Sequence, residues 1–168
     1  MTLDEFDRKI LAVMTTDATQ SYAALGKAVG LSAPAVFERV RRMRQAGVIS
    51  ATVARLDGAS IGKPLMAFVH VDCEGWGKGP RMARLSAYPE VEEMHSVAGD
   101  TSVIMKVRTA NAHALEGLLA QIYALPGVKT TRSYIALNTY LERSTQAGIT
   151  TQWPIDPRAE INPGDAPV

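Results

Sequence analysis

The period of the apolar pattern changes once along this chain, near Val48, and that change limits the possible folds more than any other feature of the sequence. Before it, apolar side chains recur at the spacing of amphipathic helices. After it, β-prone stretches of strand length alternate with short helical ones. A chain of 168 residues with 46% hydrophobic and 21% charged side chains has room for one ordinary domain or two small ones. We therefore expect a helical first part joined to a mixed α+β second part.

Residues 1–50 are predicted to form three short helices, each with its own start signal. The first follows a capping-box spacing in which the Thr2 hydroxyl caps and Glu5 lies three residues on. Ser21 and Ser32 are placed to cap the second and third helices, because a serine hydroxyl can accept a hydrogen bond from an unpaired backbone N–H. Gly30 ends the second helix and makes the turn to the third tight.

The third helix carries a high density of positive charge. Its arginines lie within six consecutive positions: Arg39, Arg41, Arg42 and Arg44. Its apolar side chains share one side at helical spacing: Val36, Val40 and Met43. Such arginines can be a merely solvated face, but a short helix and a glycine turn precede them, which is the spacing of a helix-turn-helix. The combination favours DNA binding.

The expected DNA interface lies at the starts of the second and third helices and on the exposed side of the third. Small residues at the start of the third helix let its backbone approach base edges, and the arginines suit phosphate contacts. The whole chain has a net charge of only +1, so DNA affinity has to come from this local patch. The residues expected to face DNA are Ser21, Tyr22, Ser32, Ala33, Pro34, Ala35, Glu38, Arg39, Arg41 and Arg42.

Beyond an extended connector at residues 51–63, residues 64–145 are predicted to form a second domain. Pro80 and Asn111 are placed to start its two helices. The expected strands are Leu65–Cys73, Val91–Ala98, Ser102–Thr109 and Val128–Leu137. The resulting order β-α-β-β-α-β is the ferredoxin-like arrangement.

A four-stranded sheet covered by helices on one side has a second face to bury. The strand Leu65–Cys73 has no strongly polar face, so we expect a homodimer in which a second copy covers the open face. The last segment, residues 146–168, is proline-rich and has little apolar periodicity. We expect it to be a tail lying on a surface or on another subunit.

Other features of the sequence argue against several functions. The single cysteine, Cys73, excludes an internal disulfide and a multi-cysteine metal site. The glycine-rich stretch Gly75–Gly79 lacks the spacing of a phosphate-binding loop and is expected to be a strand-to-helix connection. The histidines are scattered, and no serine belongs to a catalytic constellation, so we expect no metal, no cofactor and no enzyme activity. The sequence shows neither a signal peptide nor an apolar run that could cross a membrane, and we expect a cytoplasmic protein.

Several separated motifs resemble the Lrp/AsnC family of transcription regulators. They are Leu3–Leu11, the segment Gly30–Ile49 with its sequence GLSAPAVFERVRRMRQAGVI, Val97–Ile104, and Leu125–Val128. The resemblance covers residues 2–141 and implies an α+β protein with a winged-helix-like helix-turn-helix domain, an extended connector and a ferredoxin-like βαββαβ domain for ligand sensing and dimerisation. It further implies dimers that assemble into tetramers or octamers, a pseudo-palindromic operator in double-stranded DNA, and an amino acid as effector.

The resemblance also implies an effector site at the turn Gly99, Asp100, Thr101 and Ser102. From the residues alone this is ordinary hairpin chemistry, although glycine turns can expose backbone N–H groups to a carboxylate. Many family members carry an aspartate where this chain has Ser102. The serine lacks a negative charge that could bind the amino group of an effector.

Two alternatives remain at this stage. The first is an enzyme similar to the sirohaem decarboxylases, which share the architecture but need no DNA-reading helix. The second is an architectural protein that bends duplexes without sequence preference. Binding of sirohaem without DNA binding would favour the first, and footprints spread evenly over random DNA would favour the second.

Overall fold

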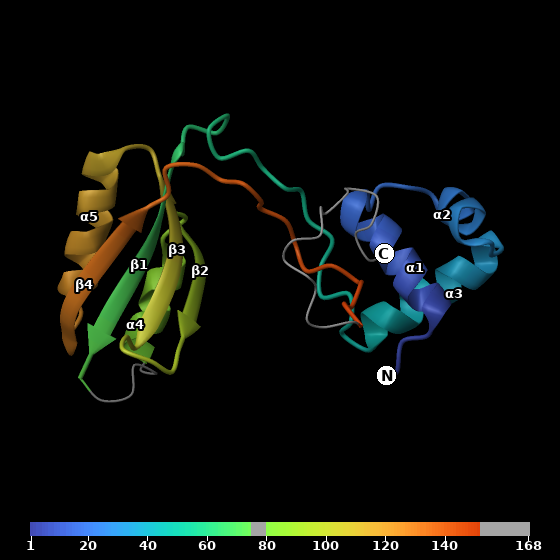
Figure 1. Cartoon of the computed structure of the whole chain (residues 1–168), viewed down its shortest axis with the longest axis horizontal. Coiled ribbons are helices and arrows are strands. Elements are labelled where there is room, and N and C mark those ends of the chain that lie inside the picture. The colour runs from blue at the N-terminus through green and yellow to red at the C-terminus, as the bar shows by residue number, and fades with distance from the viewer. Residues whose placement is uncertain (75–79, 152–168) are drawn as a thin grey trace, which may run out of the picture. The chain divides into compact units, whose positions relative to one another are not determined.

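The structure is a computed structural model that describes residues 1–74 and 80–151 (Figure 1). The chain divides into two compact units. The first contains Met1–Ala54 together with the segment that begins at Glu142, and the second is Arg55–Leu141. The glycine-rich connection expected at 75–79 and the part of the tail beyond residue 151 lie outside the described residues.

The helical unit consists of α1 (Glu5–Thr16), α2 (Tyr22–Val29) and α3 (Ala33–Gln45). Its caps at the second and third helices are those that were predicted. Ser21 Oγ accepts a hydrogen bond from Ala24 N at 3.2 Å, and Ser32 Oγ accepts one from Ala35 N at 3.4 Å. Gly30 ends α2 with a left-handed φ of 75°, a conformation that costs glycine little.

The start of α1 corrects the prediction that Thr2 is its cap. The cap is Asp4, whose Oδ1 accepts a hydrogen bond from Asp7 N at 2.8 Å, while Asp7 Oδ2 accepts one from Asp4 N at 3.2 Å. The helix therefore begins two residues later than a Thr2 cap would require, because Asp4 and Asp7 have the capping-box spacing themselves and satisfy two backbone donors reciprocally.

The core of the helical unit lies between its three helices, and the predicted packing side of α3 is its centre. The buried apolar side chains are Ile10, Leu25, Val29, Val36, Val40 and Met43. The backbone also packs closely between α2 and α3, where a Cβ on Gly26 would lie 2.4 Å from the carbonyl oxygen of Leu31. Residues 46–54 contain no strand, so no wing accompanies the helices within the described part of this unit.

The second unit is an antiparallel sheet in the order β2-β3-β1-β4, with helices on one face (Figure 1). The strands are β1 (Leu65–Cys73), β2 (Val91–Ser96), β3 (Val103–Thr109) and β4 (Val128–Ile135). The helices are α4 (Pro80–Ala83), which continues as the 3₁₀ turn η1 (Arg84–Ala87), and α5 (Ala112–Tyr123). The predicted βαββαβ order and the Asn111 cap, which accepts from Ala114 N at 2.9 Å, are confirmed.

The two faces of the sheet differ because side chains alternate along each strand. One face packs on the helices, and its strand residues are fully or almost fully buried: Ala67, Val69, Val71, Val103, Met105 and Val107. The other face carries Phe68, which is 40% exposed and lies between Lys106 of β3 and Tyr134 of β4. Its neighbour His70 has its ring centroid 5.0 Å from that of Tyr134. Among the described residues of this unit, no helix covers the second face.

The connector expected to be extended throughout residues 51–63 contains a turn. Residues 58–62 turn because Asp57 Oδ2 accepts a hydrogen bond from Ser60 N at 2.6 Å and Gly62 takes a φ of 83°. An aspartate followed by small residues and glycine favours such turns. Residues 51–57, before the turn, belong to no helix or strand.

Candidate nucleic-acid interface and effector hairpin

The start of α3 leaves its backbone accessible. Ser32 and Pro34 are exposed, and Ala33 and Ala35 are half-buried with side chains too short to cover the helix end. The start of α2 is similar at Ser21, which is exposed. Tyr22, also expected at the interface, is half-buried and lies edge-on to Phe37, with ring centroids 5.5 Å apart.

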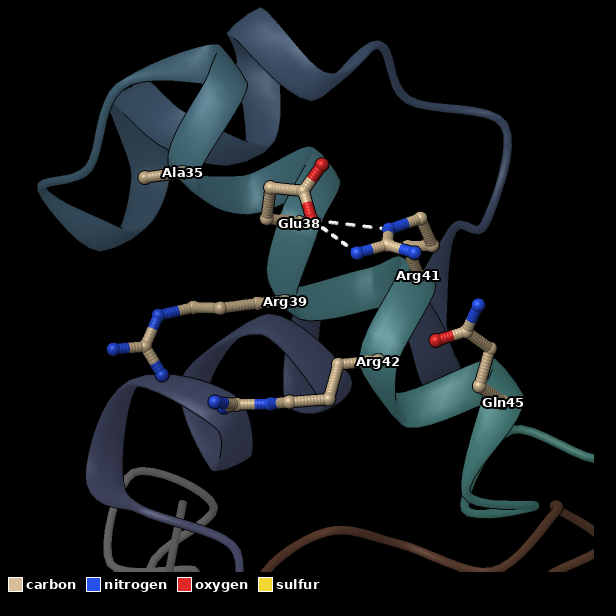
Figure 2. Close-up of a pocket in the computed structure, with 6 residues that line it drawn as sticks. All are labelled: Ala35, Glu38, Arg39, Arg41, Arg42 and Gln45. Carbon is tan, nitrogen blue, oxygen red and sulfur yellow. Dashed lines mark hydrogen bonds and ion pairs between the residues drawn. The ribbon is translucent and has the colours of Figure 1, made fainter.

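The exposed side of α3 forms a shallow hollow of about 360 Å³ (Figure 2). The residues that line it are Ala35, Glu38, Arg39, Arg41, Arg42 and Gln45. Five of these, all except Gln45, were predicted to face DNA. They lie together around one hollow, whereas the predicted residues at the starts of α2 and α3, Ser21, Tyr22, Ser32, Ala33 and Pro34, do not line it.

Two arginines of this patch reach back to the start of α1. Arg39 Nη1 donates to Asp4 Oδ2 at 2.6 Å and to Asp7 Oδ1 at 2.8 Å, and its guanidinium lies 5.5 Å from the centre of the Phe6 ring. Arg42 Nη2 lies 3.3 Å from Asp7 Oδ1 and 3.2 Å from Oδ2. The hydrogen bond from Arg39 is the main reason why the pKa of Asp4 lies below its ordinary value. Sequence reasoning did not find these ion pairs, whose aspartates lie 32 to 35 residues before the arginines.

The third arginine pairs within α3. Arg41 donates from Nη2 and Nε to Glu38 Oε2, at 2.7 and 3.0 Å, and about half of each side chain is exposed (Figure 2). Exposed pairs of this kind contribute at most about 1 kcal/mol and exchange readily with solvent ions. Arg41 is therefore the arginine of this patch whose present partner is most easily replaced by a phosphate.

The predicted effector residues form the connection between β2 and β3, but two of their side chains are used by the fold. Thr101 is buried, and its hydroxyl donates to Val71 O at 3.2 Å. Ser102 Oγ accepts from Cys73 N at 3.2 Å. Gly99 and Asp100 are exposed, and a Cβ on Gly99 would meet nothing within 4 Å. At this hairpin a ligand can reach the backbone and Asp100 more easily than the two hydroxyls.

Three charged groups lie at the hairpin and beside it. Arg132 on β4 is 3.5 Å from Asp72 Oδ2 and 4.0 Å from Asp100 Oδ2, and its Nη2 donates to Asp100 O at 3.4 Å. A hydrogen bond from Thr130 is the first cause that lowers the pKa of Asp72. A cationic group and two carboxylates thus lie within reach of one small zwitterionic ligand.

Among the described residues, no group of three or more histidine, cysteine, aspartate or glutamate side chains is arranged to hold a metal ion. In the same part of the chain, no helix combines the length and the apolar character that a membrane span requires.

Comparison with known families matches both units of the chain. Residues 3–44 match the AsnC-type helix-turn-helix domain, and residues 66–146 match the Lrp/AsnC ligand binding domain. The chain is 32% identical to the HTH-type transcriptional regulator FL11 of Pyrococcus horikoshii, over 91% of this chain and 97% of that protein. It is 39% identical to the HTH-type transcriptional regulator LrpA of Mycobacterium tuberculosis, over 82% of this chain and 92% of that one.

Solved structures of similar proteins have the same fold as this chain. A feast or famine regulatory protein from M. tuberculosis complexed with L-methionine is 36% identical and superposes with a TM-score of 0.79, covering 87% of this chain and 99% of that chain. The structure of E. coli AsnC is 26% identical with a TM-score of 0.78, covering 86% and 99%. The relatives are named as transcription regulators, which favours a regulator over the decarboxylase alternative, and the family resemblance seen in the motifs is confirmed. The chain belongs to the Lrp/AsnC family and is a DNA-binding transcription regulator with a ligand-binding domain.

Proposed function

We propose that this regulator reads its operator with the start of α3 and holds the DNA backbone with the arginines of the exposed patch. The observation that carries this proposal is the continuous hollow along α3, which places Arg41 and Arg42 on one exposed side of the helix. The accessible backbone around Ser32 and Ala35 would lie in the major groove, where base edges can be distinguished. Ser21 and Tyr22, at the start of α2, would approach a phosphate.

The open face of the sheet supports a homodimer. A small antiparallel sheet that exposes Phe68 and Tyr134 on one face gains stability by packing that face on a second copy. A two-fold dimer carries two copies of α3 and therefore reads a pseudo-palindromic site with half-sites about one helical turn apart. Further assembly of dimers into tetramers or octamers would extend the protected DNA. Such a regulator would act in the cytoplasm.

The effector is proposed to be an amino acid bound at the hairpin 99–102. Two observations support this proposal: a relative of similar fold is complexed with L-methionine, and the hairpin here offers groups of both charges. Arg132 suits the carboxylate of the ligand, and Asp100 suits its ammonium group. An effector that prefers one arrangement of dimers changes DNA affinity only by its differential binding, typically about 1–3 kcal/mol.

The DNA interface is tested by the salt dependence of binding to a duplex selected from the source genome. Each phosphate contact contributes about 0.9 to the slope of log K against log salt, so Arg41→Ala and Arg42→Ala should each flatten the slope by about that amount. Lys129→Ala on β4 removes the same charge from the other unit and should leave the slope unchanged. Unchanged slopes in both arginine variants would remove these residues from the interface, and equal affinity for random duplexes would indicate an architectural protein.

The effector site is tested by calorimetry with the proteinogenic amino acids. Asp100→Asn should weaken binding of the responding amino acid about tenfold, because a charge-assisted hydrogen bond to the ammonium group is lost. Glu116→Gln on α5 makes the same change at an exposed carboxylate away from the hairpin and serves as control. If no amino acid gives heat or alters DNA binding, the effector proposal fails.

A further inference from the structure

The three arginines of the exposed patch on α3 contact three carboxylates, two of which come from the start of α1. Arg39, Arg41 and Arg42 are all engaged by carboxylates at 3.3 Å or less. The carboxylates are those of Asp4, Asp7 and Glu38, so the three arginines are neutralised by three acidic groups before any DNA arrives. A helix that was expected to present free cations instead presents ion pairs.

Asp7 differs from the other two carboxylates. Its side chain is only 1% exposed, whereas those of Asp4 and Glu38 are at least half exposed. It accepts hydrogen bonds from both Arg39 and Arg42 and from the backbone N–H of Asp4. It therefore lies behind the two arginines and joins the start of α1 to the DNA-facing helix.

We propose that Asp7 is a positioning residue that determines how strongly the recognition helix prefers its operator over other DNA, an inference that rests on the DNA interface proposed above. Asp7 lowers the positive charge that Arg39 and Arg42 present to any phosphate. It also fixes the direction of Arg42, which is 56% exposed and bonds to Asp7 through Nη2, leaving Nη1 and Nε for a partner outside the protein.

Non-specific and sequence-specific DNA binding use the arginines differently. Binding to random DNA comes almost entirely from phosphates and counterion release, and it needs charge but no fixed geometry. Binding to an operator also needs groups held in register with particular base edges and phosphates. A buried carboxylate that neutralises and orients an arginine weakens the first kind of binding more than the second. The ratio of the two affinities therefore rises.

The test compares Asp7→Asn with Glu5→Gln in the full-length protein. Both substitutions remove one negative charge from the first turn of α1, but Glu5 pairs with Lys9 and not with an arginine of α3. The probes are a labelled duplex pool of random sequence and the tightest duplex selected by the wild type, at about 50 and 200 mM salt. Circular dichroism and thermal unfolding confirm that each variant is folded.

Asp7→Asn should bind the random pool roughly three- to tenfold more tightly at the lower salt, with a slope steeper by about 0.9, and its preference for the selected duplex should fall by a similar factor. Glu5→Gln should change both quantities less than about twofold. If the folded Asp7→Asn variant behaves like Glu5→Gln, the inference is overturned. If the wild type binds no duplex at all, the proposed DNA interface itself is overturned, which is a different result.

A second variant covers the case in which Asp7→Asn does not fold. Arg42→Lys keeps the positive charge but replaces the planar guanidinium by an ammonium group that cannot hold Asp7 and present a fixed fork outward. It should bind the random pool within about twofold of the wild type and lose roughly threefold or more in preference for the selected duplex. An unchanged preference would show that charge alone matters and would refute the role of Asp7.

Discussion

The same substitution in two helices of this protein should have opposite effects on stability. Gly26 lies in α2, and a Cβ there would be 2.4 Å from the carbonyl oxygen of Leu31 and 3.4 Å from the carbonyl carbon of Ser32. Gly117 lies in α5, and a Cβ there would meet nothing within 4 Å. Gly26→Ala therefore has to move the turn between α2 and α3, while Gly117→Ala changes only helix propensity.

The expected changes in unfolding free energy follow from these distances. Alanine is favoured over glycine inside a helix by about 1 kcal/mol, so Gly117→Ala should stabilise the ligand-binding unit by about 0.5–1 kcal/mol. At Gly26 the obstacle is backbone that has to retreat by more than about half an ångström, and overpacking of this kind costs about 1–3 kcal/mol. The hydrogen bond from Leu31 N to Gly26 O, 2.9 Å long, would also be distorted by this movement. We expect a net destabilisation of the helical unit by about 1–2 kcal/mol.

Hydrogen exchange followed by mass spectrometry is the appropriate assay, because the two units can open separately and a single unfolding midpoint would mix them. Gly26→Ala should raise exchange in peptides of α2 and α3 only, and it should weaken operator binding at least about threefold because Ser32 begins the recognition helix. Gly117→Ala should slow exchange in α5. If Gly26→Ala is as stable as the wild type and binds its operator equally well, the backbone at Leu31 does not exclude a side chain at position 26.

Three further outcomes are expected. Thr101→Val removes the buried hydroxyl that donates to Val71 O and should destabilise the ligand-binding unit by about 1 kcal/mol in urea unfolding, whereas no change would mean that the hydroxyl is not needed. Arg39 holds the pKa of Asp4 below its ordinary 3.8, so the stability gained from this pair is present above about pH 3.8 and is lost as the pH falls through the lowered pKa. The difference in unfolding free energy between wild type and Asp4→Asn should accordingly narrow in that acid range, and a constant difference would contradict the pairing. Phe68→Glu should yield monomers in sedimentation velocity, and an unchanged dimer would place the interface elsewhere.

Local signals made much of the fold predictable. The serine caps of α2 and α3, the asparagine cap of α5 and the left-handed Gly30 each depend on chemistry between neighbouring residues, and all four are found where the sequence indicates. Strand periodicity was less informative in β1, because both of its faces are largely apolar, and only the structure shows that Val69 is buried under the helices while Phe68 lies on the open face. Caps and turns of this kind can be predicted because the residues that determine them lie within a few positions of one another in the sequence.

The candidate site was predicted less completely, because its contacts span distant parts of the chain. The sequence predicted that Arg39 and Arg42 face DNA, but their partner Asp7 is 32 and 35 residues away. The three-residue spacing of Asp4 and Asp7 matches that of the two arginines, which is the one sequence signal that could have suggested the pairing. Competition between caps is similarly hard to judge, and it explains the wrong assignment of Thr2.

At the hairpin 99–102, too, contacts with distant residues could not be predicted from the sequence. The sequence marks 99–102 as a turn, but whether its hydroxyls are free depends on the register between strands. Thr101 and Ser102 bond to Val71 and Cys73 of β1, about 30 residues earlier, and only the pairing of β1 with β3 brings these groups together. A list of polar residues in a turn therefore overestimates the groups that remain available to a ligand.

The discontinuity of the helical unit has a consequence for synthesis on the ribosome. The first 54 residues emerge early and contain the whole apolar core of the three helices, so a nascent chain can form that core while the rest is still being translated. The bond from Arg8 Nη1 to Ala147 O, at 3.0 Å, is different because its acceptor is made only after the entire ligand-binding unit. The helical unit is thus completed only by a segment that is translated after the ligand-binding unit.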